Sequence, residues 1–206
     1  MGSSTLLDIL GSTVIGAMLL LILLRLNDAT VQNTYTNSSE LIVQQDLTEI
    51  VKLIEYDFRK IGYCKNFNKI PDPSKAIIYA DTSSITFLTD VANPPLYPNG
   101  DGNVDTLHYY LGPTSELSST PNPNDRMLYR VLNSETPRGS NLGVTLFHLT
   151  YYNSLGSILP TPVVHPGEIH RIEIDLQVET VAGYNQQYST IFWRQIRLVA
   201  RNLNNR

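Results

Sequence analysis

Four oxygen-bearing side chains at every second position are the clearest candidate for metal chemistry in this sequence of 206 residues. They are Asn99, Asp101, Asn103 and Asp105. Carboxylate and amide oxygens are the ligands that Ca²⁺ takes in proteins, and calcium loops place them at alternate positions. The loop pattern is incomplete, because Tyr97 stands at the first ligand position and His108 at the twelfth. A calcium site is therefore one interpretation, and a plain Asn-Gly-Asp-Gly turn is the other.

Catalytic motifs are missing from the sequence, which contains no GxSxG, HExxH, GxxxxGK[ST] or CxxC. Its four histidines stand in or beside predicted strands at no ligand spacing. They are His108, His148, His165 and His170. The single cysteine, Cys64, excludes an intramolecular disulfide framework, and a small buried thiol is its ordinary role. We therefore expect no enzyme and no cofactor, apart from calcium under the one interpretation of the loop.

Asp8 is a further chemical candidate, an acid at the edge of a long apolar run. Residues 9–24 read ILGSTVIGAMLLLILL without a charge, and two leucines just before Asp8 extend the run. About 20 apolar residues cross the ~30 Å hydrocarbon core of a bilayer as a helix. Arg25 ends the run, where its long side chain would reach the membrane interface. The sequence predicts a transmembrane helix over residues 1–26.

Two interpretations of this segment and of its acid stay open. A cleaved secretory signal is the alternative to the transmembrane helix, although no Lys or Arg precedes the run and the residues after Arg25 form only a weak cleavage pattern. Asp8 lies either at the headgroup level, where the helix dipole favours a negative charge, or beside a partner. That partner would be an amino terminus or a neighbouring subunit's helix, because an acid costs about 2.5 to 3.5 kcal/mol at the bilayer centre.

A second helical pattern predicts an amphipathic stem over residues 27–62. From Glu40 onward, apolar residues recur at intervals of three and four, which places them on one face of a helix. They are Val43, Leu47, Ile50, Ile54, Phe58 and Ile61. Gly62 stands where a glycine commonly ends a helix. The polar stretch before Glu40, NDATVQNTYTNSS, is either a continuous exposed helix or a melted hinge.

After Gly62 the sequence changes to short apolar runs separated by Pro, Gly and Asn, which is typical of β-strands. Seven strands are predicted, at residues 76–80, 84–89, 104–111, 127–132, 144–152, 169–179 and 190–201. In the sixth, aliphatic residues at even positions of 172–178 share one face and polar residues share the other, as in a sheet with one face toward water. The turn AGYNQQY at residues 182–188 would join the last two strands as a hairpin.

The apolar face of such a sheet needs a cover, and the stripe along the stem is the nearest one available. We therefore expect the α+β class, with a long N-terminal helix packed against an antiparallel β-sheet. The chain would divide into a transmembrane helix at residues 1–26, a stem helix at 27–62 and an extracytoplasmic, β-rich globular domain at 63–206. Long loops rich in Pro, Asn, Ser and Gly are where this domain would contact partners.

Several stretches carry a family resemblance. The run from Ser4, STLLDILGSTVIGAMLLLILL, resembles the N-terminal helix of type IV pilins and type II secretion pseudopilins, in which an acid stands at the fifth position; Asp8 takes that position when Ser4 is the first. DFRKIGY at residues 57–63 resembles the D-x-R-x-[AS]-G-Y signature of minor pilins of the PilW and J-type pseudopilin group. The strands after Val144 are similar to the C-terminal half of those subunits. The chain departs from the family in having Asp for the usual Glu, and Ser3 for Gly before the junction.

The resemblance implies a structural subunit, of the low-copy minor kind, in a type IV pilus-like or type II secretion-like filament. Such subunits wait in the inner membrane with the domain outside, and then join a filament at the cell surface whose core is a bundle of their helices. Asp8 would neutralise the amino terminus of a neighbour at Ser4. Arg25 would mark the C-terminal end of the helix segment that takes part in assembly. The implied partners are the membrane and other pilin-like subunits.

A monomeric, signal-anchored binding protein, whose loops hold a ligand or a partner, is the alternative function. A simple anchor needs only apolarity and has no use for Asp8, so this acid favours the filament subunit. The net charge of −4 and the scattered Lys and Arg residues give no sign of nucleic-acid binding.

Overall fold

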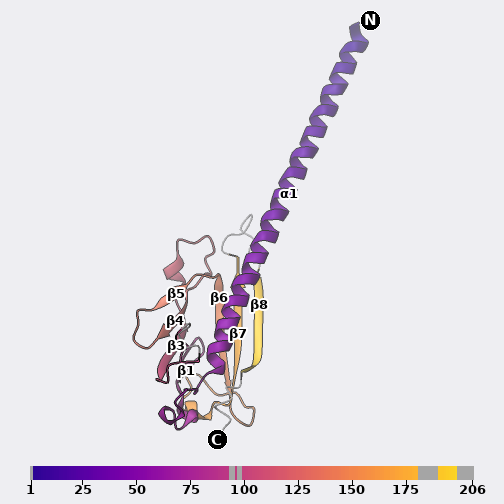
Figure 1. Cartoon of the computed structure of the whole chain (residues 1–206). Helices are drawn as coiled ribbons and strands as arrows, with labels where there is room; N and C mark the ends of the chain where they lie inside the picture. Colours follow the sequence, from indigo (N-terminus) through magenta and orange to yellow (C-terminus); the bar gives the residue numbers. More distant parts are fainter. Residues whose placement is uncertain (1, 93–95, 97–98, 181–189, 199–206) are drawn as a thin grey trace.

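A computed structural model of the chain describes residues 2–92, 96, 99–180 and 190–198. Its dominant element is α1, Gly2–Arg59, a single helix of 58 residues. At 1.5 Å per residue this helix is about 87 Å long. Its N-terminal half projects away from the rest of the molecule, and its C-terminal part lies along the strands (Figure 1). The polar stretch at residues 27–39 is helical throughout, so the stem and the apolar run form one continuous rod.

The α-helix ends at Arg59, before the predicted boundary at Gly62. The chain tightens there, because the N–H of Lys60 donates to the carbonyl of Asp57 at 3.0 Å, a bond of 3-10 type that satisfies one of the last helical carbonyls. Gly62 then adopts a φ of 73°, which a glycine tolerates without strain. Its N–H donates to the carbonyl of Leu88 at 2.8 Å, so the turn ties the end of the helix to the first sheet.

Strands of the described residues form two antiparallel sheets, one of five strands in the order β1-β2-β3-β4-β5 and one of three in the order β6-β7-β8. The first sheet contains β1 Ile77–Asp81, β2 Ser84–Thr89, β3 Asp105–Leu111, β4 Leu128–Leu132 and β5 Arg138–Ser140. The second contains β6 Val144–Tyr152, β7 Arg171–Glu179 and β8 Thr190–Leu198. Short 3-10 turns are η1 Phe67–Lys69, η2 Pro73–Lys75, η3 Thr114–Leu117 and η4 Pro166–Glu168. The predicted α+β class with antiparallel strands is confirmed.

Each predicted strand overlaps one observed strand, and β5 is the strand that the sequence did not predict. β5 has only the residues Arg-Gly-Ser, which show no apolar alternation. β7 and β8 pair antiparallel, as expected of a hairpin. The predicted turn at 182–188 and the end of the last predicted strand at 199–201 lie outside the described residues.

The outer face of β7 differs from the prediction of a face toward water. The aliphatic residues at even positions of 172–178 are fully buried, but Asp175 and Glu179 on the opposite face are buried as well. β7 is the central strand of its sheet, with a neighbour on each side. Glu179 is also covered by a loop, from which the side-chain amide of Asn122 donates to its carboxylate at 3.0 Å. The outer face of β7 is therefore polar but partly covered.

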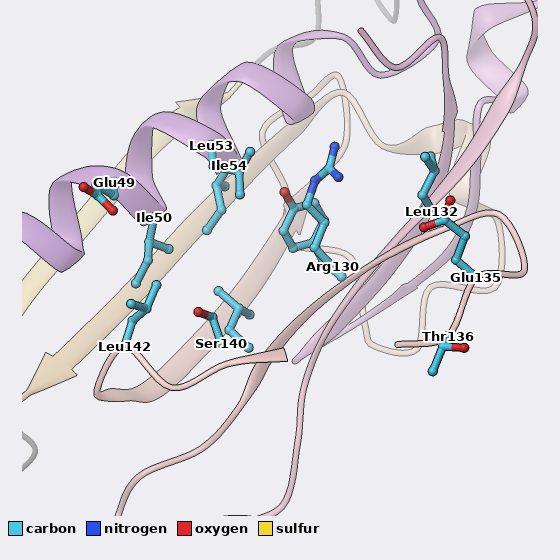
Figure 2. A pocket seen from close by; sticks show the side chains of 12 residues that line it. Glu49, Ile50, Leu53, Ile54, Arg130, Leu132, Glu135, Thr136, Ser140 and Leu142 are labelled. Carbon is cyan, nitrogen blue, oxygen red and sulfur yellow. The ribbon is translucent and has the colours of Figure 1, made fainter. Parts of the chain in front are cut away.

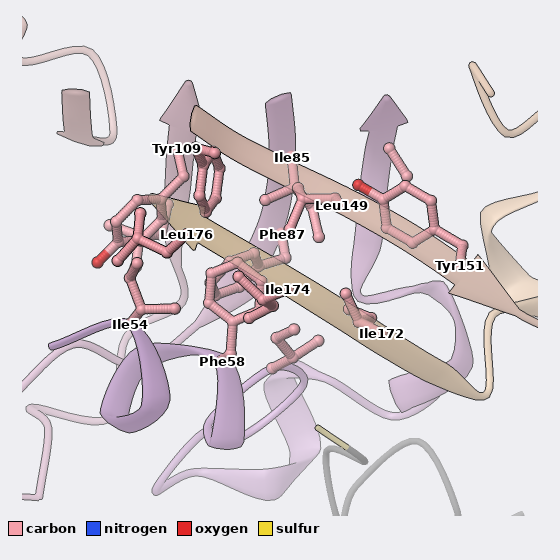
Figure 3. Close-up of a cluster of buried hydrophobic side chains, with 14 of the residues drawn as sticks. Ile54, Phe58, Ile85, Phe87, Tyr109, Leu149, Tyr151, Ile172, Ile174 and Leu176 are labelled. Atoms are coloured by element: carbon pink, nitrogen blue, oxygen red, sulfur yellow. The ribbon is translucent and has the colours of Figure 1, made fainter. Parts of the chain in front are cut away.

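A single core joins the helix to both sheets (Figure 3). The six residues of the predicted stem stripe all lie in it: Val43, Leu47, Ile50, Ile54, Phe58 and Ile61. Figure 3 shows Ile54 and Phe58 pointing from the helix toward side chains of both sheets. The ring of Phe58 meets Phe87 of β2 edge-on at 5.4 Å between centroids and Tyr109 of β3 at 5.7 Å. These contacts fix the globular head on the last turns of α1.

Candidate functional site

The exposed apolar half of α1 is the first candidate site. Every large apolar side chain from Leu6 to Leu26 is more than half exposed on this single chain. Within the described residues, α1 is the one helix long and apolar enough to cross a membrane. Exposing a continuous apolar surface of this size to water is unfavourable. The segment therefore has the properties of a membrane anchor or of a signal sequence.

Polar groups inside the apolar run are satisfied within the helix itself. Ser12 donates its hydroxyl to the carbonyl of Asp8 at 2.7 Å, and Thr13 donates to the carbonyl of Leu10 at 2.8 Å. Such bonds suit hydrocarbon surroundings, where no water is available to a hydroxyl. Between Ser4 and Leu26 the only charged residues are Asp8 and Arg25, which lie about 25 Å apart along the helix axis. Ser4, Asp8 and Arg25 are all exposed on this segment.

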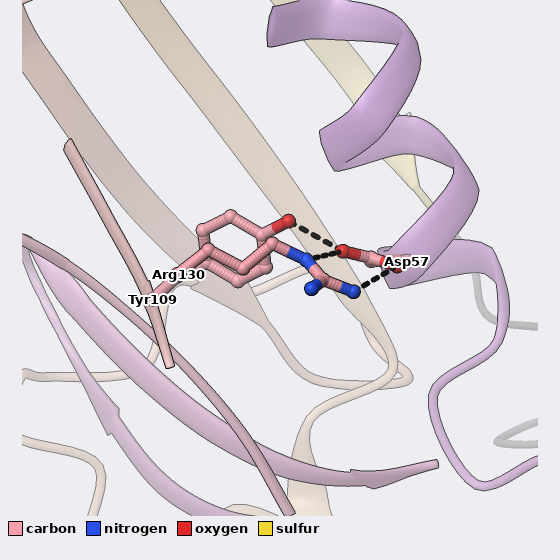
Figure 4. A network of polar contacts seen from close by, with 3 residues as sticks. All are labelled: Asp57, Tyr109 and Arg130. Carbon is pink, nitrogen blue, oxygen red and sulfur yellow. Dashed lines mark hydrogen bonds and ion pairs between the residues drawn. The ribbon is translucent and has the colours of Figure 1, made fainter. Parts of the chain in front are cut away.

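A buried ion pair clamps the other end of the helix to the first sheet (Figure 4). Asp57, only 2% exposed, accepts from Arg130 of β4 twice, from Nε at 2.6 Å and from Nη2 at 3.2 Å. The hydroxyl of Tyr109 on β3 donates to the same carboxylate at 2.5 Å. A two-pronged guanidinium–carboxylate contact fixes the angle as well as the distance between its partners. The three residues therefore set how the head sits on the stem.

Electrostatics in this cluster keep Tyr109 and Arg130 protonated. Burial, and then the charge of Asp57, raises the pKa of Tyr109 well above its usual value, so its hydroxyl keeps its proton. Burial alone would lower the pKa of Arg130, but the hydrogen bonds and charge of Asp57 outweigh it and raise that pKa. A charged guanidinium and a neutral phenol that face one carboxylate form a structural clamp.

The sequence interpretation missed this cluster, although one signal points to it. Asp57 lies three residues after Ile54 in the apolar stripe, on the buried side of the stem, where an unpaired acid would be costly. A buried acid requires a cationic or donor partner, but no local pattern says that Arg130, far along the chain, supplies it.

Asp90 organises the loop in which a calcium site was predicted. Its buried carboxylate accepts from three backbone N–H groups, those of Lys65, Asp101 and Gly102, each at 3.0 Å. A Cβ on Gly100, whose φ is 101°, would lie 2.0 Å from this carboxylate, so only glycine fits there. The loop is therefore held by a carboxylate that is already saturated with donors.

Three of the four predicted calcium ligands are engaged in hydrogen bonds. Asp101 accepts from the backbone N–H and the side-chain amide of Asn103, while Asn103 itself accepts from the ammonium of Lys69 at 2.5 Å. Asp105 accepts from Val91 and Asn133 instead. Asn99 is exposed in a turn. No group of three or more His, Cys, Asp or Glu side chains is placed to hold a metal within the described residues. The calcium site and the plain turn therefore both stay predictions.

Two other chemical groups are buried. Cys64 is a buried free thiol 3.8 Å from Asp90, and burial is the first cause that raises its pKa. Asp125 is 1% exposed, and neither of its carboxylate oxygens has a hydrogen-bond partner among the described residues. Burial, together with the charge of Glu179, raises the pKa of Asp125. The thiol is thus poorly reactive, and the charged form of Asp125 is less favourable in the fold than in water.

A cavity of about 390 Å³ opens between α1 and the edge of the first sheet (Figure 2). Figure 2 shows Ile50, Leu53 and Ile54 on the helix side, with Leu132 and Leu142 across from them. Its floor is an edge of the core, because Leu132 and Leu142 are partly buried side chains packed against that core. The cavity is therefore preformed and mostly apolar.

No protein-family model matches the chain, and no curated protein matches it. The arrangement seen here is one long apolar N-terminal helix joined at its far end to antiparallel sheets. This arrangement is compatible with a pilin-like fold.

Proposed function

We propose that this chain is a structural subunit of a type IV pilus-like or type II secretion-like filament, of the low-copy minor kind. One observation carries the proposal: an apolar helical segment that is exposed along its whole length continues, without a break, into the core of a globular head. A membrane can cover that segment in one subunit, and the equivalent segments of other subunits can cover it in a bundle. No active site is needed for this role, and the subunit is not an enzyme.

The motif at residues 57–63 supports membership of the PilW and J-type pseudopilin group. Asp57 forms the clamp to the first sheet, Gly62 makes the turn out of the helix, and the carbonyl of Tyr63 accepts the N–H of Asp90 at 2.9 Å. Three residues of the motif, Asp57, Gly62 and Tyr63, therefore have a task at the junction of stem and head.

Asp8 would act during assembly. In the membrane it sits near the end of the apolar run, and in a bundle of helices it would pair with the amino terminus of a neighbour at Ser4. An unpaired carboxylate inside such a bundle would be penalised heavily, so only one register along the axis is favourable. The subunit would be held in the inner membrane with its head outside the cytoplasm, and would later lie in a filament at the surface.

A membrane-anchored binding protein is the second candidate, and the apolar cavity of about 390 Å³ favours it. That role uses the same anchor but makes no demand on Asp8.

Replacement of Asp8 tests the proposal. In the native host, Asp8→Ala should remain in the membrane fraction and disappear from the sheared filament fraction, read by immunoblot and by immunogold electron microscopy. Asp28→Ala, which removes an exposed acid from the same helix outside the apolar run, is the matched control and should assemble like the parent. Asp8→Ala at parental level in the filaments would contradict the role of this acid. A parent chain that never enters filaments would leave the binding protein as the function.

A further inference from the structure

Asp125 is a buried acid that neither the clamp at Asp57 nor the apolar half of α1 uses. It lies in the loop between η3 and β4 and is 1% exposed. Both of its carboxylate oxygens are buried, and neither has a hydrogen-bond partner among the described residues. A carboxylate in this state is costly, because it has lost its water and gained no donor in return. Its two oxygen atoms therefore require a donor or a positive charge.

The hydroxyl nearest to this acid does not supply the donor. Burial raises the pKa of Asp125, and the nearby hydroxyl of Thr120 lowers it by less. That hydroxyl has one proton, and it donates to the backbone carbonyls of Leu117 and Asn122 at 2.9 and 3.1 Å. The loop therefore brings a hydroxyl oxygen and two carbonyl oxygens close to the carboxylate, and none of the three is a donor to it.

A cationic side chain does not supply the charge either. Among the residues that the structure describes, no ion pair joins Asp125 to Arg126 or to any other Lys or Arg. Residues 181–189, which follow β7, contain no Lys, Arg or His. Arg138 stands opposite Arg130 in the first sheet, five positions from Asp125 in the sequence, which is about 16 Å along an extended chain.

A second buried acid, Glu179 at the end of β7, stands beside the same loop. Asn122 and Asn124 of the loop donate their side-chain amides to its carboxylate at 3.0 and 3.3 Å, and Gln177 donates at 2.9 Å. An ionised carboxylate offers about four acceptor positions, so these three donors leave one open. The charge of Glu179 also contributes to raising the pKa of Asp125, which places the two acids near each other.

A divalent cation answers both problems at once, since it neutralises two neighbouring acids and gives the oxygens of Asp125 a partner. A proton would remove the charge of Asp125, but its O–H would need an acceptor, and no described atom is within reach. The available ligands are all oxygen atoms: two carboxylates, the hydroxyl of Thr120 and the carbonyls of Leu117 and Asn122. Oxygen ligands in an irregular loop suit Ca²⁺ better than a transition metal.

We propose that Asp125 and Glu179 bind one Ca²⁺ ion between the loop before β4 and the end of β7. This site is separate from the loop at residues 99–105. The loop before β4 connects two strands of the first sheet, whereas β7 belongs to the second, so the ion ties the two sheets together. It does so near the stem, because Glu179 lines a hollow with Val43 and Asp46 of α1. The inference is independent of the proposed function.

Thermal unfolding of the full chain in detergent, after removal of metals with a chelator, tests the site. Calcium chloride at about 10 mM should raise the unfolding midpoint by about 4 °C, for a dissociation constant of about 1 mM. Magnesium chloride at the same concentration should raise it less, because Mg²⁺ demands short, regular octahedral coordination. Asp125→Asn keeps the shape of the side chain and should remove the calcium shift. Without calcium it should unfold no earlier than the parent, which excludes misfolding.

Asp101→Asn is the matched control, because it removes an acid from the loop at residues 99–105 and leaves the proposed site intact. It should keep the calcium shift of the parent. A shift that Asp101→Asn loses and Asp125→Asn keeps would place the ion in the other loop and overturn the inference. A parent chain whose midpoint does not respond to calcium would overturn it as well, and would leave Asp125 as a protonated acid.

Discussion

Asp57 is the residue on which the geometry of the molecule depends most directly. It lies on the last turn of the helix, it is almost fully buried, and it bridges to two strands through Arg130 and Tyr109. Breaking a buried ion pair by removing one partner leaves an uncompensated charge, which costs more than the pair itself contributes. The cluster is therefore more important for orientation than for net stability.

Asp57→Ala should lower the free energy of unfolding by about 3 kcal/mol, because Arg130 and Tyr109 would lose their shared acceptor. Denaturant unfolding of the full chain in detergent, followed by the fluorescence of Trp193, would measure the loss. Glu55→Ala is the matched control: it breaks an exposed pair with Arg59 at 3.4 Å and should cost less than about 1 kcal/mol. Equal losses in both variants would show that the clamp has no special role.

The raised pKa of Tyr109 predicts that the stability of the fold decreases at alkaline pH. Its pKa is raised in the folded chain by burial and by Asp57, whereas in the unfolded chain it is about 10. Stability from this group is therefore complete below about pH 10 and decreases as the pH rises toward the folded pKa. Tyr109→Phe should cost about 1 kcal/mol at neutral pH and should make the decrease between about pH 10 and 12 shallower. Unfolding midpoints across this range test it, with Tyr56→Phe as an exposed control; an unchanged slope would contradict the assignment.

Among the elements, α1 forms a single rod from the apolar run to the stem. Residues 27–39 are mostly polar and mostly exposed, yet they remain helical between an apolar run and a buried stripe. Hydroxyls such as that of Thr34, which donates to the carbonyl of Thr30 at 2.9 Å, are satisfied along this stretch. The stretch therefore links two anchored segments without a joint.

Spin labels at Asp28 and Gln44 should report one narrow distance near 24 Å, because sixteen helical residues rise by about that much. The double change Asn33→Gly with Thr34→Pro should broaden the distribution, since proline removes a helical N–H and clashes with the preceding turn at a cost of about 3 kcal/mol. Pulsed electron paramagnetic resonance measures both. A broad distribution in the parent would mean that the stretch melts.

The elements that the sequence predicts well are those whose pattern is local. The stripe from Val43 to Ile61 follows helical spacing, and all of its residues are buried. β7 was located correctly, but burial of Asp175 and Glu179 could not be foreseen, because it depends on neighbouring strands and on a loop carrying Asn122. The ion pair of Asp57 and Arg130 was not predicted for the same reason: the two residues are 73 positions apart, and only the fold brings them together.

At the scale of the whole molecule, none of the described residues buries the apolar half of α1. Its side chains stay more than half exposed up to Leu26, and the core begins only at Val43. The number of sheets was not predictable, since short strands alone do not say whether they join one sheet or two. The division of the chain into an apolar helix and a globular head was predictable, because the two parts differ in amino-acid composition.

Ile15→Arg should weaken membrane insertion, since an arginine near the centre of a transmembrane helix costs about 2.5 to 3.5 kcal/mol. Extraction of membranes with alkaline carbonate should release much of this variant and leave the parent in the pellet. Leu41→Arg places the same charge on an exposed position of the stem and should stay with the parent. Retention of Ile15→Arg in the pellet would indicate that the segment does not span the bilayer.

The unbroken helix has a mechanical consequence. A pull on the apolar end would travel along the rod with no compliant joint to absorb it, and would load the packing at Phe58 and the clamp at Asp57 in shear, many bonds at once. Under tension the head would not peel away from its rod step by step; the two would part only when the core itself gives way.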